Sequence, residues 1–373
     1  MLSSSLVLPA HGNAPYLIGI KLLRDITMDI CIPEYYGDNQ RSILKEEFPD
    51  IAERIFLSKK MGTLLKPLLR DKTNSSHFNT YALNVRENVE RVSKTLEANY
   101  REGIDAISLS GTRKMFSKFD FALNTGLPII SPVEPVFFAF VGKMSAIYDY
   151  DLLPSKSGDA EFQRYITDLA KTWRKIEASF NGMFIPRLNS LSYKDKEYNQ
   201  TGITFTPPFA RRSLLDNTVI PYGSILVIAS ATGKDIEKLS ALSASSSGSY
   251  LTLPDSPQEI KLPHVPSSVW GNPNIIAVLA RGGLGSIWQA LIDQKPIGLV
   301  NTPPEDDPEI FHNANTVQWA GIGTILEENV MPLIGALPQY LSAIQKQLNL
   351  EKQEFGTIDG FEFTIAQLKQ MLT

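Results

Sequence analysis

A chain of 373 residues that is 43% hydrophobic and 20% charged can bury two hydrophobic cores, and it lacks the low hydrophobicity and high net charge that keep a chain disordered. Its 36 Lys and Arg residues against 40 Asp and Glu residues give a formal net charge of −4, so no overall basic charge favours nucleic acid as a partner. The single cysteine, Cys31, excludes disulfide scaffolds and cysteine-rich metal sites.

The N-terminal residues have no positively charged region and too short an apolar run for a secretory signal. The most apolar stretch further on, at 135–144, is interrupted by Lys143 and falls short of a membrane span. We therefore expect a cytoplasmic protein, and peripheral contact with a membrane surface stays open.

The first half alternates between apolar runs and helical patterns. The elements predicted there are strands at 2–9 and 28–33 around a helix at 17–26, then a strand at 103–111, a helix at 117–126, a strand at 127–132 and a helix at 159–181. Such alternation predicts an α/β fold in which helices cover both faces of a parallel sheet.

A proline-rich stretch at 204–223 separates this half from a second one and is typical of a linker between domains. The elements predicted after it are strands at 224–230, 249–254, 274–280 and 295–300 and helices at 234–242 and 360–372. We therefore expect α/β domains at 1–208 and 223–355, joined by a linker at 209–222, and a C-terminal helix at 356–373 that packs back on the first domain.

A glycine cluster, "ARGGLGSIWQAL" at 280–291, lies between an apolar run and a helical pattern. The first backbone N–H groups of a helix have no intrahelical partner, and Gly282, Gly283 and Gly285 would let an anion approach them closely, with the Ser286 hydroxyl beside them. Alternatively, the glycines serve only a tight turn and close helix packing. The cluster alone is compatible with both interpretations.

The surrounding order of motifs favours the anion site. The stretch from 272 to 326, which contains "LARGGLGSIWQALIDQKPIGLV" and then "EDDPEIFHNA" and "GIG", resembles the nucleotide-sugar signature of the GT-B glycosyltransferases, especially the UDP-glycosyltransferases. The resemblance implies two doubly wound Rossmann-like domains facing across a cleft, the first binding the acceptor and the second the nucleotide sugar. The upstream "LPHVPSS" is similar to the base-binding segment of that family, which places Val265 at the base.

The chain departs from the family pattern at several donor-binding positions. The phosphate-binding histidine of the family falls on Arg281, whose guanidinium is always charged and binds phosphate through two hydrogen bonds. The ribose-binding glutamate falls on Gln289, which keeps hydrogen-bonding capacity but loses the charge. For the sugar-binding pair the candidates are Asp306 and Asp307, and the alternative for both is a solvated acidic loop before a helix.

The loop at 230–235, "SATGKD", follows the first strand of the second half. By its position in the resembling fold it implies a second set of diphosphate ligands, Ser230, Thr232 and Gly233. The alternative is an ordinary strand-to-helix connection.

The candidate catalytic base is His11, because the family carries a Gly-His-x-x-Pro loop after its first strand and this chain has "HGNAP" with Gly and His exchanged. An imidazole suits general-base chemistry at neutral pH, whereas a turn histidine is the alternative. Glu134, at the carboxyl end of a predicted strand, would act as a base if burial raised its pKa; the competing interpretation is an exposed loop acid.

The resemblance implies an inverting, metal-independent transfer of a sugar from a nucleotide diphosphate, foremost UDP, to an acceptor that is a small molecule, glycan, lipid or protein. We expect no cofactor and no metal, and we give little weight to the isolated "DYD" at 149–151. Two alternatives remain: a sugar-nucleotide epimerase of the same fold, which needs more acidic and histidine groups than four histidines favour, and a catalytically silent nucleotide-binding or scaffold protein.

Overall fold

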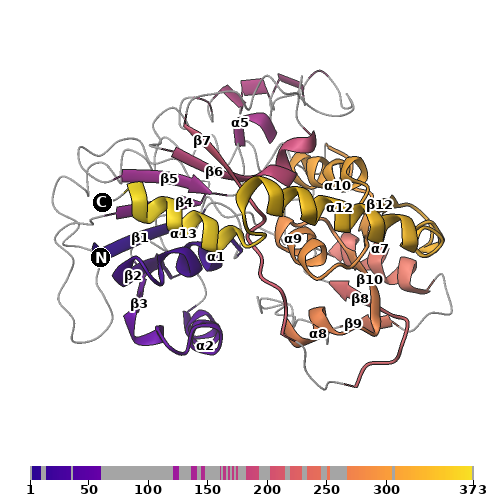
Figure 1. The fold of residues 1–373 in the computed structure, drawn as a ribbon, viewed down its shortest axis with the longest axis horizontal. Helices are drawn as coiled ribbons and strands as arrows, with labels where there is room; N and C mark the ends of the chain where they lie inside the picture. Colours follow the sequence, from indigo (N-terminus) through magenta and orange to yellow (C-terminus); the bar gives the residue numbers. More distant parts are fainter. Residues whose placement is uncertain are drawn as a thin grey trace.

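A computed structural model shows two α/β layers in one chain, and each layer is built on a β-sheet of parallel strands (Figure 1). The residues that the structure describes are 2–9, 14–34, 37–59, 121–125, 136–140, 144–147, eight positions between 160 and 174, 182–192, 202–214, 219–228, 233–244, 250–252, 267–304 and 307–371.

The first layer is a seven-stranded sheet in the order β3-β2-β1-β4-β5-β6-β7, and all its strand pairs are parallel. Its strands are β1 (Leu2–Pro9), β2 (Thr27–Pro33), β3 (Ile55–Ser58), β4 (Phe121–Thr125), β5 (Val136–Phe140), β6 (Gly182–Pro186) and β7 (Ile203–Thr206). A sheet covered on both faces explains why β6 is buried along its whole length.

Helices of the first half include α1 (Ala14–Leu23), which contacts β1, β2 and β4, and α2 (Gly37–Glu47). Shorter helical segments follow them in the chain: η1 (Ala52–Arg54), α5 (Met144–Ile147) and η4 (Arg187–Ser192). The strands predicted at 2–9 and 28–33 and the helix at 17–26 are confirmed, and the eight described residues between 160 and 174 are helical as predicted.

The helix predicted at 117–126 is wrong, because residues Phe121–Thr125 form β4 in the middle of the sheet. β4 pairs in parallel with β1, Ser5 opposite Phe121, and with β5. Residues 118–121, Lys-Phe-Asp-Phe, alternate with the period of a strand, and the glycine at 126 can end either element. The strands predicted at 103–111 and 127–132 lie outside the described residues.

The second layer is a five-stranded parallel sheet in the order β12-β11-β10-β8-β9. Its strands are β8 (Ser224–Ile228), β9 (Tyr250–Thr252), β10 (Ile275–Ala280), β11 (Ile297–Val300) and β12 (Gly323–Leu326). The helices of this half are α7 (Gly233–Ala244), α8 (Ser267–Gly271), α9 (Leu284–Ile292), α10 (Pro308–Ala320), α11 (Met331–Ile334), α12 (Leu337–Phe355) and α13 (Gly360–Met371). Among these helices, α12 was not predicted from the sequence.

Both strand orders are those of doubly wound sheets, in which the chain winds outward in two directions from a central pair. That switch occurs between β1 and β4 in the first sheet and between β8 and β10 in the second. Ligands of such sheets bind at the carboxyl ends of the strands beside the switch. In the second sheet this edge carries the residues that follow Ala280 of β10 and Ile228 of β8, which lie opposite each other in the pairing.

The last helix, α13, returns to the first layer, where it contacts α1 and β7 (Figure 1). Its first residue is Gly360, where a Cβ would lie 2.3 Å from the Pro207 carbonyl oxygen, so only glycine fits there. The Phe361 ring then packs 5.5 Å from Phe209, whose ring lies 5.8 Å from Trp288 of α9. Aromatic packing therefore joins the two layers through the segment that connects them.

Candidate functional site

The candidate site is the junction of β10 and α9, at the switch point of the second sheet. Gly283 caps α9 with no side-chain hydrogen bond, and its carbonyl oxygen accepts from the amides of Ser286 and Ile287 at 3.1 and 3.2 Å. The amides of Leu284 and Gly285, earlier in the first turn, are of the class that has no intrahelical acceptor. Gly283 and Gly285 are exposed, and a Cβ on either would meet no atom within 4 Å. The start of α9 is therefore open to an approaching anion.

Gly282 has a different reason to be glycine. Its φ of 120° lies where side chains are strained, and a Cβ there would stand 3.3 Å from Cγ2 of Ile310. The side-chain amide of Asn313 in α10 donates to the Gly282 carbonyl oxygen at 2.9 Å in a buried position. The loop is thus held by α10 on one side, and the turn interpretation applies to Gly282. Anion binding at Gly283 and Gly285 stays a prediction.

Arg281 and Asp307 form an ion pair next to this loop. The Arg281 guanidinium donates to Asp307 Oδ2 at 2.9 Å, and the two side chains are only 15% and 9% exposed. Asp307 Oδ1 accepts from the Ile310 amide at 3.3 Å and so caps α10. The structure therefore brings together a predicted phosphate ligand and a predicted sugar ligand, and the positive charge of Arg281 is already partly compensated.

Gln289 faces the chain segment that connects the two layers. The two hydrogens of its side-chain amide are shared among three acceptors: Asp293 Oδ2 at 2.7 Å, the Arg211 carbonyl oxygen at 2.9 Å and Ser213 Oγ at 3.1 Å. Asp293 in turn accepts from the Ser213 amide at 2.9 Å and from its hydroxyl at 2.5 Å. In the described structure Gln289 fastens α9 to the linker, and its predicted contact with a ribose stays a prediction.

Lys295 follows α9 and connects the end of this helix to the start of β10. It is 8% exposed, and its ammonium donates to the carbonyl oxygens of Asn272 and Ile275 at 2.9 and 2.8 Å. Burial lowers the pKa of Lys295, and the nearby Asp293 carboxylate opposes that change. These bonds hold the start of β10 against the end of α9.

Gly233, predicted as a diphosphate ligand, is the first residue of α7, the helix that follows β8. Because β8 and β10 are parallel neighbours, the starts of α7 and α9 share one edge of the sheet. The half-buried Ser286 lies in the first turn of α9. The other predicted residues lie outside the described part of the chain: His11, Glu134, Ser230, Thr232, Val265 and Asp306.

Two features of this region were not predicted from the sequence. The buried indole N–H of Trp288 donates to Asn189 Oδ1 in η4 at 3.0 Å, which joins α9 to the first layer. Nothing in the local pattern predicts a contact between residues so far apart in the chain. The second feature is the capping role of Asp307, for which the Asp-Pro pair at the start of α10 is a readable signal.

Within the described ranges no group of three or more His, Cys, Asp and Glu side chains is arranged to hold a metal ion. In the same ranges no helix has both the length and the apolar character that crossing a membrane requires.

Comparison with models of known protein families gave no match, and comparison with curated protein sequences gave none. Solved structures do match. Phytolacca americana UGT2, complexed with UDP-2-fluoro-glucose and pterostilbene, is 10% identical with a TM-score of 0.61, over 99% of both chains. Os79 from O. sativa, in complex with U2F and trichothecene, is 14% identical with a TM-score of 0.61, over 99% of this chain and 100% of its own. The calicheamicin glycosyltransferase CalG4 is 12% identical with a TM-score of 0.56, over 99% of this chain and 98% of its own.

At such low identity the likeness shows the fold. The chain has the fold of the GT-B glycosyltransferases over nearly its whole length, as the sequence predicted. The strand orders of the two sheets agree with two Rossmann-like units.

Proposed function

We propose that this chain is a glycosyltransferase that moves a sugar from a nucleotide diphosphate, foremost UDP, to an acceptor bound by the first domain. The observation that carries the proposal is the open start of α9, with exposed Gly283 and Gly285 beside the Arg281 guanidinium, at the switch point of the second sheet. This is where a doubly wound sheet binds its ligand and where a helix favours phosphate. Solved structures of the same fold are complexes with UDP or a UDP-sugar analogue.

In this mechanism the leaving diphosphate develops negative charge at the start of α9. The amides of the first turn and the Arg281 guanidinium would stabilise that charge, as a fixed set of donors that needs no reorganisation. They would supply the positive potential for which other enzymes use a metal ion, so we propose metal-independent transfer. His11, with Glu134 as the second candidate, would take the proton of the acceptor hydroxyl as its oxygen attacks the sugar carbon, and a single displacement inverts that carbon.

The test is calorimetric titration of the full chain with UDP, GDP and dTDP, with and without Mg²⁺, followed by incubation with the matching nucleotide sugar. Metal-independent binding of one nucleotide, weakened at least tenfold in Arg281→Ala, supports the donor site. Release of free nucleotide from the nucleotide sugar, lost in His11→Ala, supports transfer chemistry. If none of the three nucleotides binds, the proposal is wrong.

A catalytically silent nucleotide-binding protein is the second candidate, and a specific observation favours it. Asp307 partly neutralises Arg281, and the linker engages Gln289, so two predicted donor ligands are committed to contacts within the chain. The same titration separates the two candidates, because a silent protein would bind the nucleotide without any turnover of the nucleotide sugar.

A further inference from the structure

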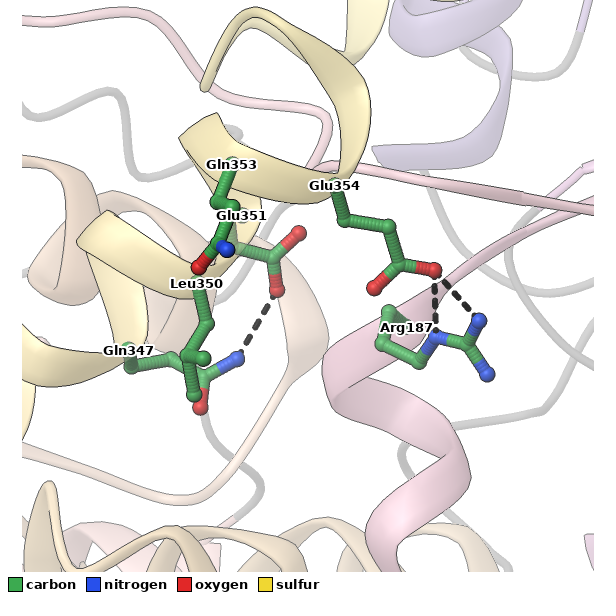
Figure 2. Close-up of a pocket in the computed structure, with 6 residues that line it drawn as sticks. All are labelled: Arg187, Gln347, Leu350, Glu351, Gln353 and Glu354. Carbon is green, nitrogen blue, oxygen red and sulfur yellow. Dashed lines mark hydrogen bonds and ion pairs between the residues drawn. The ribbon is translucent and has the colours of Figure 1, made fainter.

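A cavity of about 430 Å³ lies between η4 and the second half of α12 (Figure 2), and none of its lining residues belongs to the β10–α9 junction. Its volume falls within the range of small-molecule sites. The side chains that line it, which we call the seam pocket, are Arg187, Gln347, Leu350, Glu351, Gln353 and Glu354. Because η4 follows the first sheet and α12 follows the second, the walls of the seam pocket come from both halves of the chain.

Glu351 is the unusual member of this set. It is 1% exposed, on the same face of α12 as the buried Ile344 and Leu348. Its Oε1 accepts from the Gln347 amide at 2.9 Å. Its buried Oε2 has no hydrogen-bond partner among the described residues. A buried carboxyl oxygen without a partner costs free energy, so its presence in a pocket wall points to a ligand that supplies the missing donor.

Among the described residues of the pocket wall, the one cation is Arg187, and it does not supply that donor. Arg187 donates from Nε, at 3.2 Å, and from a terminal nitrogen to the same oxygen of Glu354, and its guanidinium stacks 3.8 Å from the centre of the Phe205 ring. In Figure 2 the second oxygen of Glu354 is turned toward the Glu351 carboxyl. Two carboxyl oxygens thus face the same space, while the guanidinium engages the far side of Glu354.

These groups select the chemistry of the occupant. Two carboxyl groups disfavour an anion, and a purely apolar ligand would leave Glu351 Oε2 without a donor. A primary ammonium carries three N–H donors and a positive charge, so it satisfies one oxygen of each carboxyl with a donor to spare for a glutamine carbonyl. Leu350 provides an apolar wall for the carbon chain of such a ligand.

We propose that the seam pocket binds a small organic molecule through a primary ammonium group held between Glu351 and Glu354. The contacts of the ammonium would come from α12, while Arg187 of η4 holds Glu354 through their ion pair. The seam pocket shares no lining residue with the proposed nucleotide site, and neither proposal depends on the other.

Binding would be coupled to a proton. Burial, and then the Glu354 carboxylate, raise the pKa of Glu351 to about 7, against the opposing effects of the Gln347 hydrogen bond and of Arg187. Below that pH the ammonium meets a neutral carboxyl group, and binding releases the Glu351 proton to solvent while the ligand keeps its own. Affinity for an ammonium ligand therefore rises between pH 6 and pH 8.

The test is titration of the full chain with 4-amino-1-butanol. Binding is measured by calorimetry and by the shifts of backbone amide NMR signals. Two comparison probes change one property each: 1,4-butanediol lacks the charge, and (4-hydroxybutyl)trimethylammonium keeps the charge but has no N–H donor. We expect a Kd of about 1 mM for the amine, the range open to so small a ligand, and binding at least tenfold weaker for the two comparison probes. Glu351→Gln should weaken amine binding at least tenfold, and the exposed control Glu328→Gln should leave it unchanged.

Three results would overturn the proposal: no saturable binding of the amine, equal binding of all three probes, or unchanged amine binding in Glu351→Gln. Circular dichroism melts confirm that the variants fold. If a variant fails to fold, the pH dependence of the unaltered chain decides, because an affinity that does not rise from pH 6 to pH 8 contradicts a proton-coupled site.

Discussion

Arg281 donates to Asp307 at 2.9 Å, and Asp307 at the same time caps α10 through its other oxygen. One carboxylate therefore joins the end of β10 to the start of α10 and also partly neutralises Arg281, which directly precedes the first glycine of the cluster in the chain. A diphosphate that binds there must share Arg281 with Asp307, so the pair sets how much positive charge the site offers.

Asp307→Asn should separate the two roles of this carboxylate. Asparagine is as good a helix cap as aspartate, so α10 keeps its start, while the negative charge is removed. We expect UDP to bind roughly tenfold more tightly because Arg281 is no longer compensated, and we expect the free energy of unfolding without nucleotide to fall by about 1–2 kcal/mol. Calorimetry and urea denaturation measure the two effects. Weaker UDP binding in this variant would mean instead that Asp307 itself contacts the donor.

Alanine substitutions in the glycine cluster should affect stability and nucleotide binding differently at different positions. Gly283→Ala and Gly285→Ala place a methyl group in open space, so stability should change by less than about 1 kcal/mol. Nucleotide binding should weaken at least tenfold, because the methyl group stands where a phosphate approaches the amides.

Gly282→Ala provides the contrasting result. Its backbone has a φ of 120°, and the new Cβ would press on Ile310, so we expect a loss of about 1–3 kcal/mol in the free energy of unfolding. Thermal melts and UDP titration on the three variants test the division. If Gly283→Ala and Gly285→Ala bind UDP like the unaltered chain, the glycines serve the turn alone.

Local patterns were sufficient to predict the second sheet around the candidate site. The apolar run at Ile275–Ala280, the glycine cluster and the apolar run that ends at Val300 predict a β-α-β unit within one short stretch, and β10, α9 and β11 confirm it. The helix prediction for 117–126 failed because these few residues fit both a helical and a strand period. Pairing with the neighbouring strands β1 and β5 selects the strand.

Such patterns did not predict the hydrogen-bond partners of the site residues. Two acceptors of Gln289 lie in the linker, and the acceptor of the Trp288 indole is Asn189 in η4. These contacts depend on how the two layers pack, for which no period in the sequence carries information. Glu351 does leave a trace, because it follows Ile344 and Leu348 at helical spacing, and an acid on an apolar helix face is unusual.

Gln289→Glu restores the residue type of the resembling enzymes and should nevertheless harm this chain. The new carboxylate would face Asp293 Oδ2 and the Arg211 carbonyl oxygen, which now accept at 2.7 and 2.9 Å, so two donors are replaced by repulsion. We expect the free energy of unfolding to fall by about 2 kcal/mol at pH 7 and to recover partly at pH 5 as the carboxyl pair takes up a proton.

The neutral control is Gln289→Met, which loses the hydrogen bonds without adding charge and should show no such recovery. Urea denaturation at the two pH values makes the comparison. If Gln289→Glu instead binds UDP more tightly with unchanged stability, the side chain leaves the linker and contacts the donor, as the resemblance implies.

Glu351→Gln should change how stability depends on pH. The pKa of Glu351 is raised from 4.5 to about 7, chiefly by burial, so the folded chain holds this proton more tightly than the unfolded chain does. The contribution of this group to stability is fully present below pH 4.5 and is lost as pH rises through about 7. The loss amounts to about 3 kcal/mol above that pH, since each pKa unit corresponds to about 1.4 kcal/mol.

Glutamine keeps the acceptor for the Gln347 amide and never ionises, so the variant should be more stable than the unaltered chain at pH 8 by up to about 3 kcal/mol, with the advantage shrinking toward pH 5. Urea denaturation of both proteins from pH 5 to pH 8 gives the difference directly, because the titration of all other groups cancels. The exposed Glu328→Gln should run parallel to the unaltered chain. A Glu351→Gln curve that also runs parallel would show that Glu351 is ionised throughout, which requires a cation or a donor already at its buried oxygen.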